Sequence, residues 1–115
     1  MGGYVTFWRA ARVADGGIIP EILVVITGLS GGMFWRNNTG AGFIRGRWIE
    51  FGCVGSGDIL GCYRGRGVAI ECKSSTGRHR GKQRDFQAAW EAAGGLYILA
   101  RSVDDVLLAL GVSGG

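Results

Sequence analysis

Glycine is the feature that most constrains the fold of this chain, because it accounts for 23 of the 115 residues while proline accounts for one. The glycine share is about three times that of an average protein. The glycines follow no fixed period and lie between apolar stretches, which excludes a collagen-like repeat and a flexible linker. They predict short helices and strands separated by tight turns, and places where the backbone approaches another group closely.

Length and composition narrow the class of protein. The length allows one compact domain, and a hydrophobic share of 47% supplies its core. The longest strongly apolar run, residues 22–26, is far shorter than the roughly 18 residues of a membrane helix. Residues 1–4 lack the basic and then apolar order of a signal peptide. We therefore expect a cytoplasmic protein with no membrane partner, and its net charge of +4 is typical of proteins that bind polyanions.

The cysteines predict neither disulfides nor a metal centre. Cys53, Cys62 and Cys72 make an odd number, and no secretion signal accompanies them. A zinc site would need all three together with His79, and none of them forms the close ligand pair that such sites use. We expect three reduced thiols.

Hydrophobic periodicity and turn residues predict the order of elements. Residues 20–29 suit a helix or a strand, although Pro20 followed by Glu21 favours a helix start. The expected strands are residues 33–38, closed by a turn at 37–40, then 43–51, 58–63, 68–73 and 96–100, and the expected later helices are residues 82–93 and 103–110. This order predicts an α/β domain, with a small mixed β-sheet flanked by helices, over residues 18–115. Residues 1–17 form an N-terminal extension with no assigned role.

Three polar residues of the predicted hairpin at 58–73 form a pattern that carries chemistry. Glu71 and Lys73 are two residues apart on one strand, so their side chains point to the same face. If the hairpin loop has an even number of residues, Asp58 lies opposite Glu71 or Lys73 and shares that face. An odd loop or a bulge would shift this register.

This pattern has a catalytic and a structural interpretation. Two carboxylates about 5 Å apart repel each other unless a cation or a proton lies between them. Mg²⁺ takes one or two carboxylates in proteins, and the Cys72 carbonyl would add an oxygen ligand. Lys73 would orient a metal-bound water, assist its deprotonation or stabilise developing charge, which predicts metal-assisted phosphodiester hydrolysis. The alternative is an ordinary hairpin with a surface salt bridge between Lys73 and a carboxylate.

Basic residues concentrate around this pattern, since ten of the thirteen lie between positions 36 and 84. With neighbouring glycines and hydroxyl groups they suit contacts to nucleic-acid phosphates, and the start of the 82–93 helix would add its dipole. A solvated basic face is the alternative. The candidate DNA-binding residues are Arg36, Asn38, Arg78, Arg80, Lys82 and Arg84.

A set of segments in fixed order carries a family resemblance. The segments FWRNNTG (34–40), GSGDILG (55–61) and IECK (70–73) are followed by Gly77-Arg78, Gln83 and Trp90. In this combination, from about residue 21 to 101, the chain resembles the virus-type replication-repair nuclease (VRR-Nuc) domain, a branch of the PD-(D/E)XK nuclease superfamily. The resemblance implies a restriction-endonuclease-like fold and DNA cleavage with Mg²⁺ or Mn²⁺. Gly57 stands where the family frequently has proline.

The resemblance also implies roles for individual residues. Asp58, Glu71 and Lys73 would form the catalytic core, Gln83 would contact the site or the scissile phosphate, and Glu21 would be the outlying acid that completes a metal site. The implied protein is a homodimeric endonuclease of the phage Holliday-junction-resolving kind, acting on branched DNA in a bacterial or phage-infected cell. The alternatives are a nick, flap, single-strand or nonspecific DNA nuclease and a DNA-binding module without catalysis. An RNA-binding domain would need exposed aromatic residues on a sheet face, whereas the aromatic spacing here favours a core.

Overall fold

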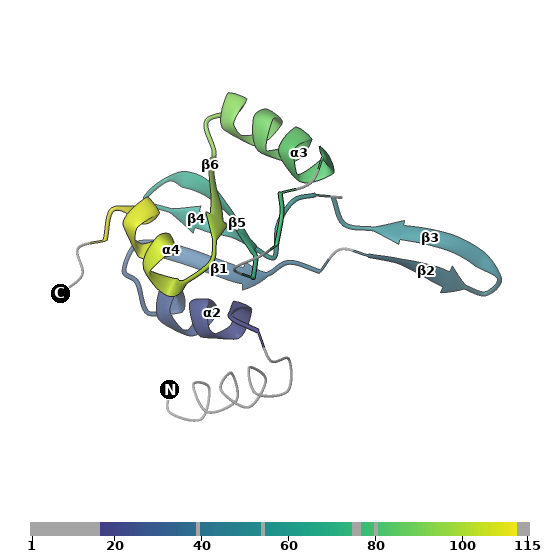
Figure 1. Ribbon diagram of the computed structural model, residues 1–115, viewed down its shortest axis with the longest axis horizontal. Coiled ribbons are helices and arrows are strands. Elements are labelled where there is room, and N and C mark those ends of the chain that lie inside the picture. Colours follow the sequence, from purple (N-terminus) through teal and green to yellow (C-terminus); the bar gives the residue numbers. More distant parts are fainter. Residues whose placement is uncertain (1–16, 39, 54, 75–76, 80, 113–115) are drawn as a thin grey trace.

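The computed structural model describes residues 17–38, 40–53, 55–74, 77–79 and 81–112 (Figure 1). Its helices are α2 (Ile19–Thr27), α3 (Gly81–Ala92) and α4 (Val103–Leu110). Its strands are β1 (Gly32–Arg36), β2 (Gly40–Ile44), β3 (Arg47–Phe51), β4 (Ile59–Tyr63), β5 (Arg66–Cys72) and β6 (Leu96–Ala100). In the described part of the chain, no helix has the length and apolar character needed to cross a membrane.

Four strands form the central sheet in the order β1-β4-β5-β6. β4 is antiparallel to both of its neighbours, β1 and β5, whereas β6 runs parallel to β5. Helices α2 and α4 cover one face of this sheet, and α3 covers the other (Figure 1). The predicted fold class, an α/β domain with a small mixed sheet flanked by helices, is confirmed.

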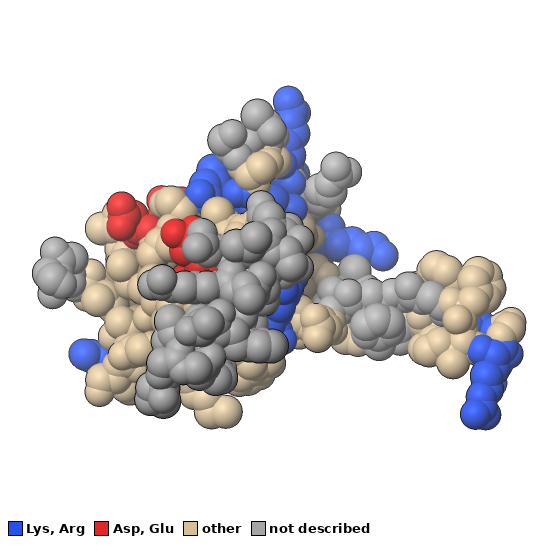
Figure 2. Space-filling view, turned by 90° about the horizontal axis from the view of Figure 1, so that it is seen from below, with Lys and Arg blue, Asp and Glu red and all other residues tan. Residues whose placement is uncertain are grey.

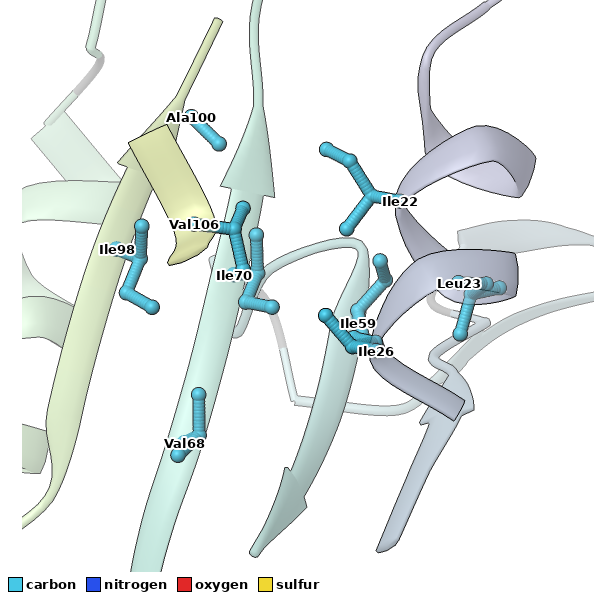
Figure 3. Packing of buried hydrophobic residues seen from close by; sticks show 9 residues of the cluster. All are labelled: Ile22, Leu23, Ile26, Ile59, Val68, Ile70, Ile98, Ala100 and Val106. Carbon is cyan, nitrogen blue, oxygen red and sulfur yellow. The ribbon is translucent and has the colours of Figure 1, made fainter. Parts of the chain in front are cut away.

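The hydrophobic core lies between the sheet and the layer formed by α2 and α4 (Figure 3). Its buried residues are Ile22, Leu23, Ile26, Ile59, Val68, Ile70, Ile98, Ala100 and Val106. Because side chains alternate along a strand, the burial of Ile70 in this core turns its neighbour Glu71 to the opposite face. The core therefore determines that the candidate acid faces α3.

Local capping explains where two of the helices begin and end. Pro20 lies in the first turn of α2, where its missing N–H has no intrahelical partner to lose. Residues 20–29, which were open between helix and strand, therefore form a helix over most of their length. The Ser102 hydroxyl accepts a hydrogen bond from the Asp105 N–H at 3.2 Å, and Gly111 ends α4 in the left-handed conformation. The helix predicted over 103–110 is confirmed.

Residues 40–51 depart most from the prediction. The single strand expected over 43–51 is wrong, because β2 and β3 pair with each other in a separate two-stranded sheet. The turn expected over 37–40 lies partly outside the described residues. Arg45 and Gly46 form the turn with φ values of 52° and 76°. A tight two-residue hairpin needs positive φ at both positions. This hairpin, called the arm below, projects from the body of the protein (Figure 1).

The expectation that aromatic residues fill the core is wrong for the arm and for Trp35 of β1, whereas Phe34 of β1 packs against the core. Phe43 and Trp48 of the arm are exposed, and so is Trp35. Phe86 and Trp90 behave as expected in part, because they are half-buried and stack with ring centroids 5.3 Å apart. These two residues attach α3 to the sheet, which fixes the helix that carries Gln83.

Candidate active site

The β4–β5 hairpin brings the predicted acids to one end of the sheet. Its loop has two residues, and its regular pairing ends with Ile59 opposite Ile70. The even loop and this register agree with the sequence prediction. Asp58 immediately precedes the pair on one strand and Glu71 immediately follows it on the other, so the two acids lie side by side at the open end of the hairpin.

The backbone turns at Asp58, and this turn aims its carboxylate. The Asp58 N–H donates to the Ile70 carbonyl on β5, while its C=O accepts from the Asn37 N–H that follows β1, both at 2.8 Å. A regular strand residue directs both groups to the same neighbour, so Asp58 departs from strand geometry. Its Oδ2 accepts from the Cys72 N–H at 2.8 Å, which holds the carboxylate against the end of β5.

Hydrogen bonds from Asn37 and the close approach of two glycines to neighbouring backbone position the loop that leads into Asp58. The Asn37 Nδ2 donates to the Ser56 hydroxyl at 2.6 Å and to the Gly57 carbonyl at 2.9 Å. A Cβ at Gly57, whose φ is 105°, would lie 2.9 Å from the Ile70 carbonyl oxygen. A Cβ at Gly55 would lie 2.4 Å from the Lys82 carbonyl oxygen in the first turn of α3. The glycines therefore let this loop fit between β5 and α3.

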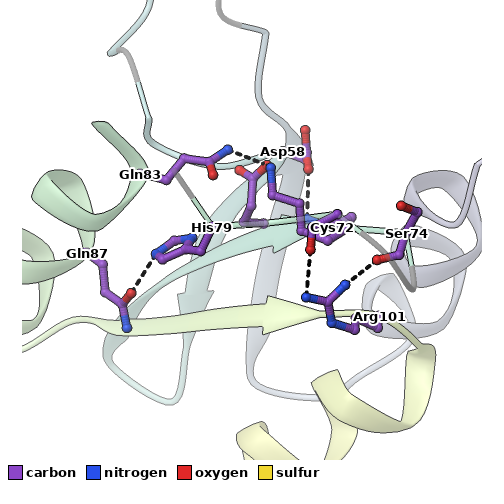
Figure 4. Close-up of polar contacts among 10 residues, drawn as sticks. Asp58, Cys72, Ser74, His79, Gln83, Gln87 and Arg101 are labelled. Atoms are coloured by element: carbon purple, nitrogen blue, oxygen red, sulfur yellow. Dashed lines mark hydrogen bonds and ion pairs between the residues drawn. The ribbon is translucent and has the colours of Figure 1, made fainter. Parts of the chain in front are cut away.

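Glu71 is the centre of the candidate site, to which Asp58 and Gln83 also belong (Asp58 and Gln83 are labelled in Figure 4). It is only 7% exposed, and its Oε1 accepts from the Gln83 Nε2 at 3.0 Å and lies 3.4 Å from the Lys73 Nζ. Burial raises the pKa of Glu71, the nearby Asp58 carboxylate raises it further, and Lys73 opposes both. The structure thus brings together Asp58, Glu71, Lys73 and Gln83, as the sequence predicts.

Cys72 contributes backbone groups, and not its thiol, to the candidate site. Burial, followed by the charges of Asp58 and Glu71, raises the pKa of the thiol to about 12, so the sulfur stays protonated. Alternation along β5 turns the Cys72 N–H and C=O toward the same edge, and the N–H already bonds to Asp58 there. The carbonyl therefore faces the edge at which the two carboxylates meet.

The donor set fits a divalent oxygen-preferring cation. Burial and the neighbouring half-buried Asp58 carboxylate both raise the pKa of the buried Glu71, and a cation between the two carboxylates would relieve their repulsion. Asp58, Glu71 and the Cys72 carbonyl offer three oxygen ligands and leave room for water, which suits Mg²⁺ or Mn²⁺. The Glu21 side chain is exposed on α2, and its part in this donor set stays a prediction. No group of three or more acid, Cys or His side chains placed to hold a metal occurs among the described residues.

The predicted DNA-binding residues lie on the surface around the site. Arg36, Asn38, Arg78, Lys82 and Arg84 are all exposed, and Arg80 lies outside the described residues. The positive charge of Arg36 opposes the rise in the pKa of Cys72, so this arginine lies close enough to the candidate site to act on it electrostatically. In Figure 2, basic side chains lie beside the root of the arm and at its far end, whereas the visible acidic side chains lie on the other side of the body.

Arg101 is a positioning residue that no sequence motif indicates. Its guanidinium donates to the Ser74 carbonyl and, at 2.8 Å, to the Gly77 carbonyl (Figure 4). These carbonyls belong to the loop that follows Lys73. Arg101 follows β6, and only the parallel pairing of β5 with β6 brings it to that loop.

Tyr97 and His79 lie beneath α3, on the side of the sheet that carries Glu71. Burial raises the pKa of Tyr97, and the Glu71 and Asp58 carboxylates raise it further, so the phenol stays neutral. The Tyr97 hydroxyl and the His79 Nδ1 are buried without a hydrogen-bond partner among the described residues. His79 Nε2 shares a hydrogen bond of 2.8 Å with the Gln87 Oε1, which links the loop after Lys73 to α3.

No family model matches the chain, and the comparisons with curated proteins and with solved structures likewise found no match.

A Glu71→Gln variant is expected to reveal what it costs the fold to ionise a buried acid that lies beside a second carboxylate. Because the folded-state pKa of Glu71 lies above its ordinary value of 4.5, ionisation of this group destabilises the fold. The protonated acid contributes its whole stabilising effect when the pH is below the ordinary value of 4.5, and this effect is lost as the pH rises through the raised pKa of the folded state. In EDTA, the variant should therefore be more stable than the wild type at neutral pH and equal to it in acid, as measured by urea unfolding.

If the site binds Mg²⁺, addition of the ion should make the wild type more stable than the Glu71→Gln variant at neutral pH. The wild type gains unfolding free energy from a ligand that binds only its folded form, about 2.7 kcal/mol at one hundred times the Kd. The variant, which lacks one anionic ligand, gains less. Equal stabilities of the two proteins at every pH, with or without Mg²⁺, would contradict the assignment.

Proposed function

We propose that this protein is a metal-dependent endonuclease that hydrolyses phosphodiester bonds in branched DNA, as a VRR-Nuc-type enzyme of the Holliday-junction-resolving kind. The observation that carries the proposal is the meeting of Asp58, Glu71, Lys73 and Gln83 at one end of the β4–β5 hairpin. A surface salt bridge alone would not require a buried glutamate, a second carboxylate beside it and an amide from another element.

The site divides the reaction among its residues. Bound by Asp58, Glu71 and the Cys72 carbonyl, Mg²⁺ or Mn²⁺ would supply the positive charge that makes a water nucleophilic near neutral pH and offsets charge on the phosphate. The Lys73 ammonium, held by Glu71 at 3.4 Å, orients the attacking water and stabilises negative charge on the phosphate. Gln83 fixes the Glu71 carboxylate through its amide and lies at the start of α3, close to an approaching phosphate.

The charge around the site supports DNA as the substrate. Exposed Arg36, Arg78, Lys82 and Arg84 can contact phosphates without reading bases, so recognition rests on DNA shape. A two-fold homodimer would present two such sites to two strands, as symmetrical cleavage of a junction needs. We place this activity in the cytoplasm of a bacterial or phage-infected cell.

A panel of substrates tests the proposal. A four-way junction, a flap, a nicked duplex, a linear duplex and a single strand are incubated with the protein in Mg²⁺, Mn²⁺ or EDTA. We expect symmetrical cuts in the junction with either metal and none in EDTA. Equal cleavage of the linear duplex would reduce the protein to a nonspecific nuclease, and binding without any cleavage would make it a DNA-binding module.

A further inference from the structure

We propose that the arm recognises the branch point of the DNA, by stacking Phe43 and Trp48 on exposed bases and by binding phosphates through Arg45 and Arg47. The inference rests on the proposed function and specifies how the same site selects its substrate. Three features of the arm support the inference: its point of attachment to the body, its two exposed aromatic rings and the arginines at its tip.

The arm is attached at the catalytic edge. The chain leaves the body after Asn38, and it returns through the loop that ends at Asp58. Asn37, at the end of β1, bonds to both Gly57 and Asp58, so the outgoing and returning segments are tied together beside the site. In Figure 1 the hairpin extends from this point into solvent, away from all three described helices. DNA held against Asp58 and Glu71 would therefore pass the root of the arm.

The arm carries two large exposed aromatic side chains on one face. Phe43 and Trp48 are directly opposite in the register, with ring centroids 5.1 Å apart in an edge-to-face arrangement. They are 74% and 59% exposed, so they contribute little to the core. Contiguous exposed aromatic surface marks a binding site. Stacking on an aromatic ring accepts any base, provided that the base is accessible outside a continuous duplex, as it is at a branch point.

The tip of the arm is basic. Arg45 occupies a left-handed position, with φ of 52°, at which asparagine or glycine is preferred. An arginine there places a guanidinium at the outermost point of the hairpin, and Arg47 follows at the start of β3. Figure 2 shows this positive end separated from the body. A polyanion complements it, whereas a second copy of the chain would bring an arm tip of the same charge.

The charge of the tip is tested with Arg45→Asn, which removes the guanidinium and suits the turn. The matched control is Arg64→Asn: Arg64 has φ of 50° in the two-residue turn of the β4–β5 hairpin, at the end far from Asp58. Both variants are made in an Asp58→Asn background so that binding is measured without cleavage. We expect Arg45→Asn to weaken junction binding and to lower the slope of log Kd against log salt by about 0.9, and Arg64→Asn to change neither.

The aromatic pair is tested with Trp48→Leu and Phe43→Leu in the same background. Loss of one stacked base should weaken junction binding about tenfold while linear-duplex binding changes little, so the preference for the junction falls. Light scattering on each variant reports the oligomeric state. Unchanged junction preference in both leucine variants, or a change in oligomeric state with unchanged DNA binding, would overturn the inference. Because these readouts need no cleavage, the arm assignment survives or fails separately from the nuclease assignment.

Discussion

Asp58→Asn is expected to lower metal-dependent cleavage of the preferred DNA by about a thousandfold, which corresponds to about 4 kcal/mol of transition-state stabilisation. In the wild type the Cys72 N–H donates to the Asp58 Oδ2 at 2.8 Å. The amide oxygen of asparagine can accept the same hydrogen bond, so the end of β5 keeps it. What the variant loses is one of two negative charges that attract the cation. The loss therefore measures metal-assisted chemistry rather than folding.

The measurement is single-turnover cleavage at saturating protein, together with DNA binding in EDTA. Binding should be unchanged or tighter, because a negative charge beside the phosphate has been removed. Asp104→Asn is the matched control, since Asp104 is an exposed acid in the first turn of α4, a helix on the opposite face of the sheet from Glu71. Wild-type cleavage by Asp58→Asn would exclude this residue as a metal ligand and the proposed site with it.

Gly57→Ala is expected to destabilise the protein by about 3 kcal/mol and to abolish cleavage. A side chain at φ of 105° is strained, and its Cβ would lie 2.9 Å from the Ile70 carbonyl oxygen and 3.2 Å from the carbonyl carbon. That oxygen accepts the Asp58 N–H. Relief of the clash must move Asp58 away from β5, which separates its carboxylate from Glu71.

Gly111→Ala is the control that separates the cost of a positive φ from the cost of a steric clash. Gly111 also has a positive φ, 75°, but a Cβ there meets nothing within 4 Å. We expect it to cost about 1 kcal/mol and to leave cleavage intact. Urea unfolding and single-turnover cleavage compare the two variants, and a Gly57→Ala protein as stable and active as Gly111→Ala would show that the close approach to Ile70 is unimportant. Proline would not fit the φ of 105° at position 57, because its ring holds φ near −65°.

The hairpin signals show why one turn was predicted and another was not. Arg64-Gly65 lies between two clear strands, and the prediction of β4 and β5 from it is confirmed. Arg45-Gly46 has the same residue types, yet the apolar residues on both sides of it make 43–51 read as one strand. Residues 43–51 alternate well enough to predict one continuous strand, so their periodicity gave no sign of a reversal.

In the candidate site, too, some positions could be predicted from local sequence and others could not. Spacing along one hairpin predicted that Asp58, Glu71 and Lys73 share a surface, because register in a two-residue hairpin is a local property. The assignment of Gln83 to the site came from the family resemblance alone. Its contact with Glu71 depends on the packing of α3 against β6. The helix that carries Glu21 forms as expected and the acid is exposed, so its part in the site stays a prediction.

By itself, the amino-acid order determined which segments become helices and strands in most of the described chain, and the β4–β5 register that sets two acids beside each other, since both depend on neighbours within a few residues. Only tertiary packing decided that Asp58 leaves the strand ladder, that Arg101 holds the loop after Lys73, and that residues 40–51 extend from the body as an arm. Those features depend on contacts between segments that are distant in the chain, and no local period encodes such contacts.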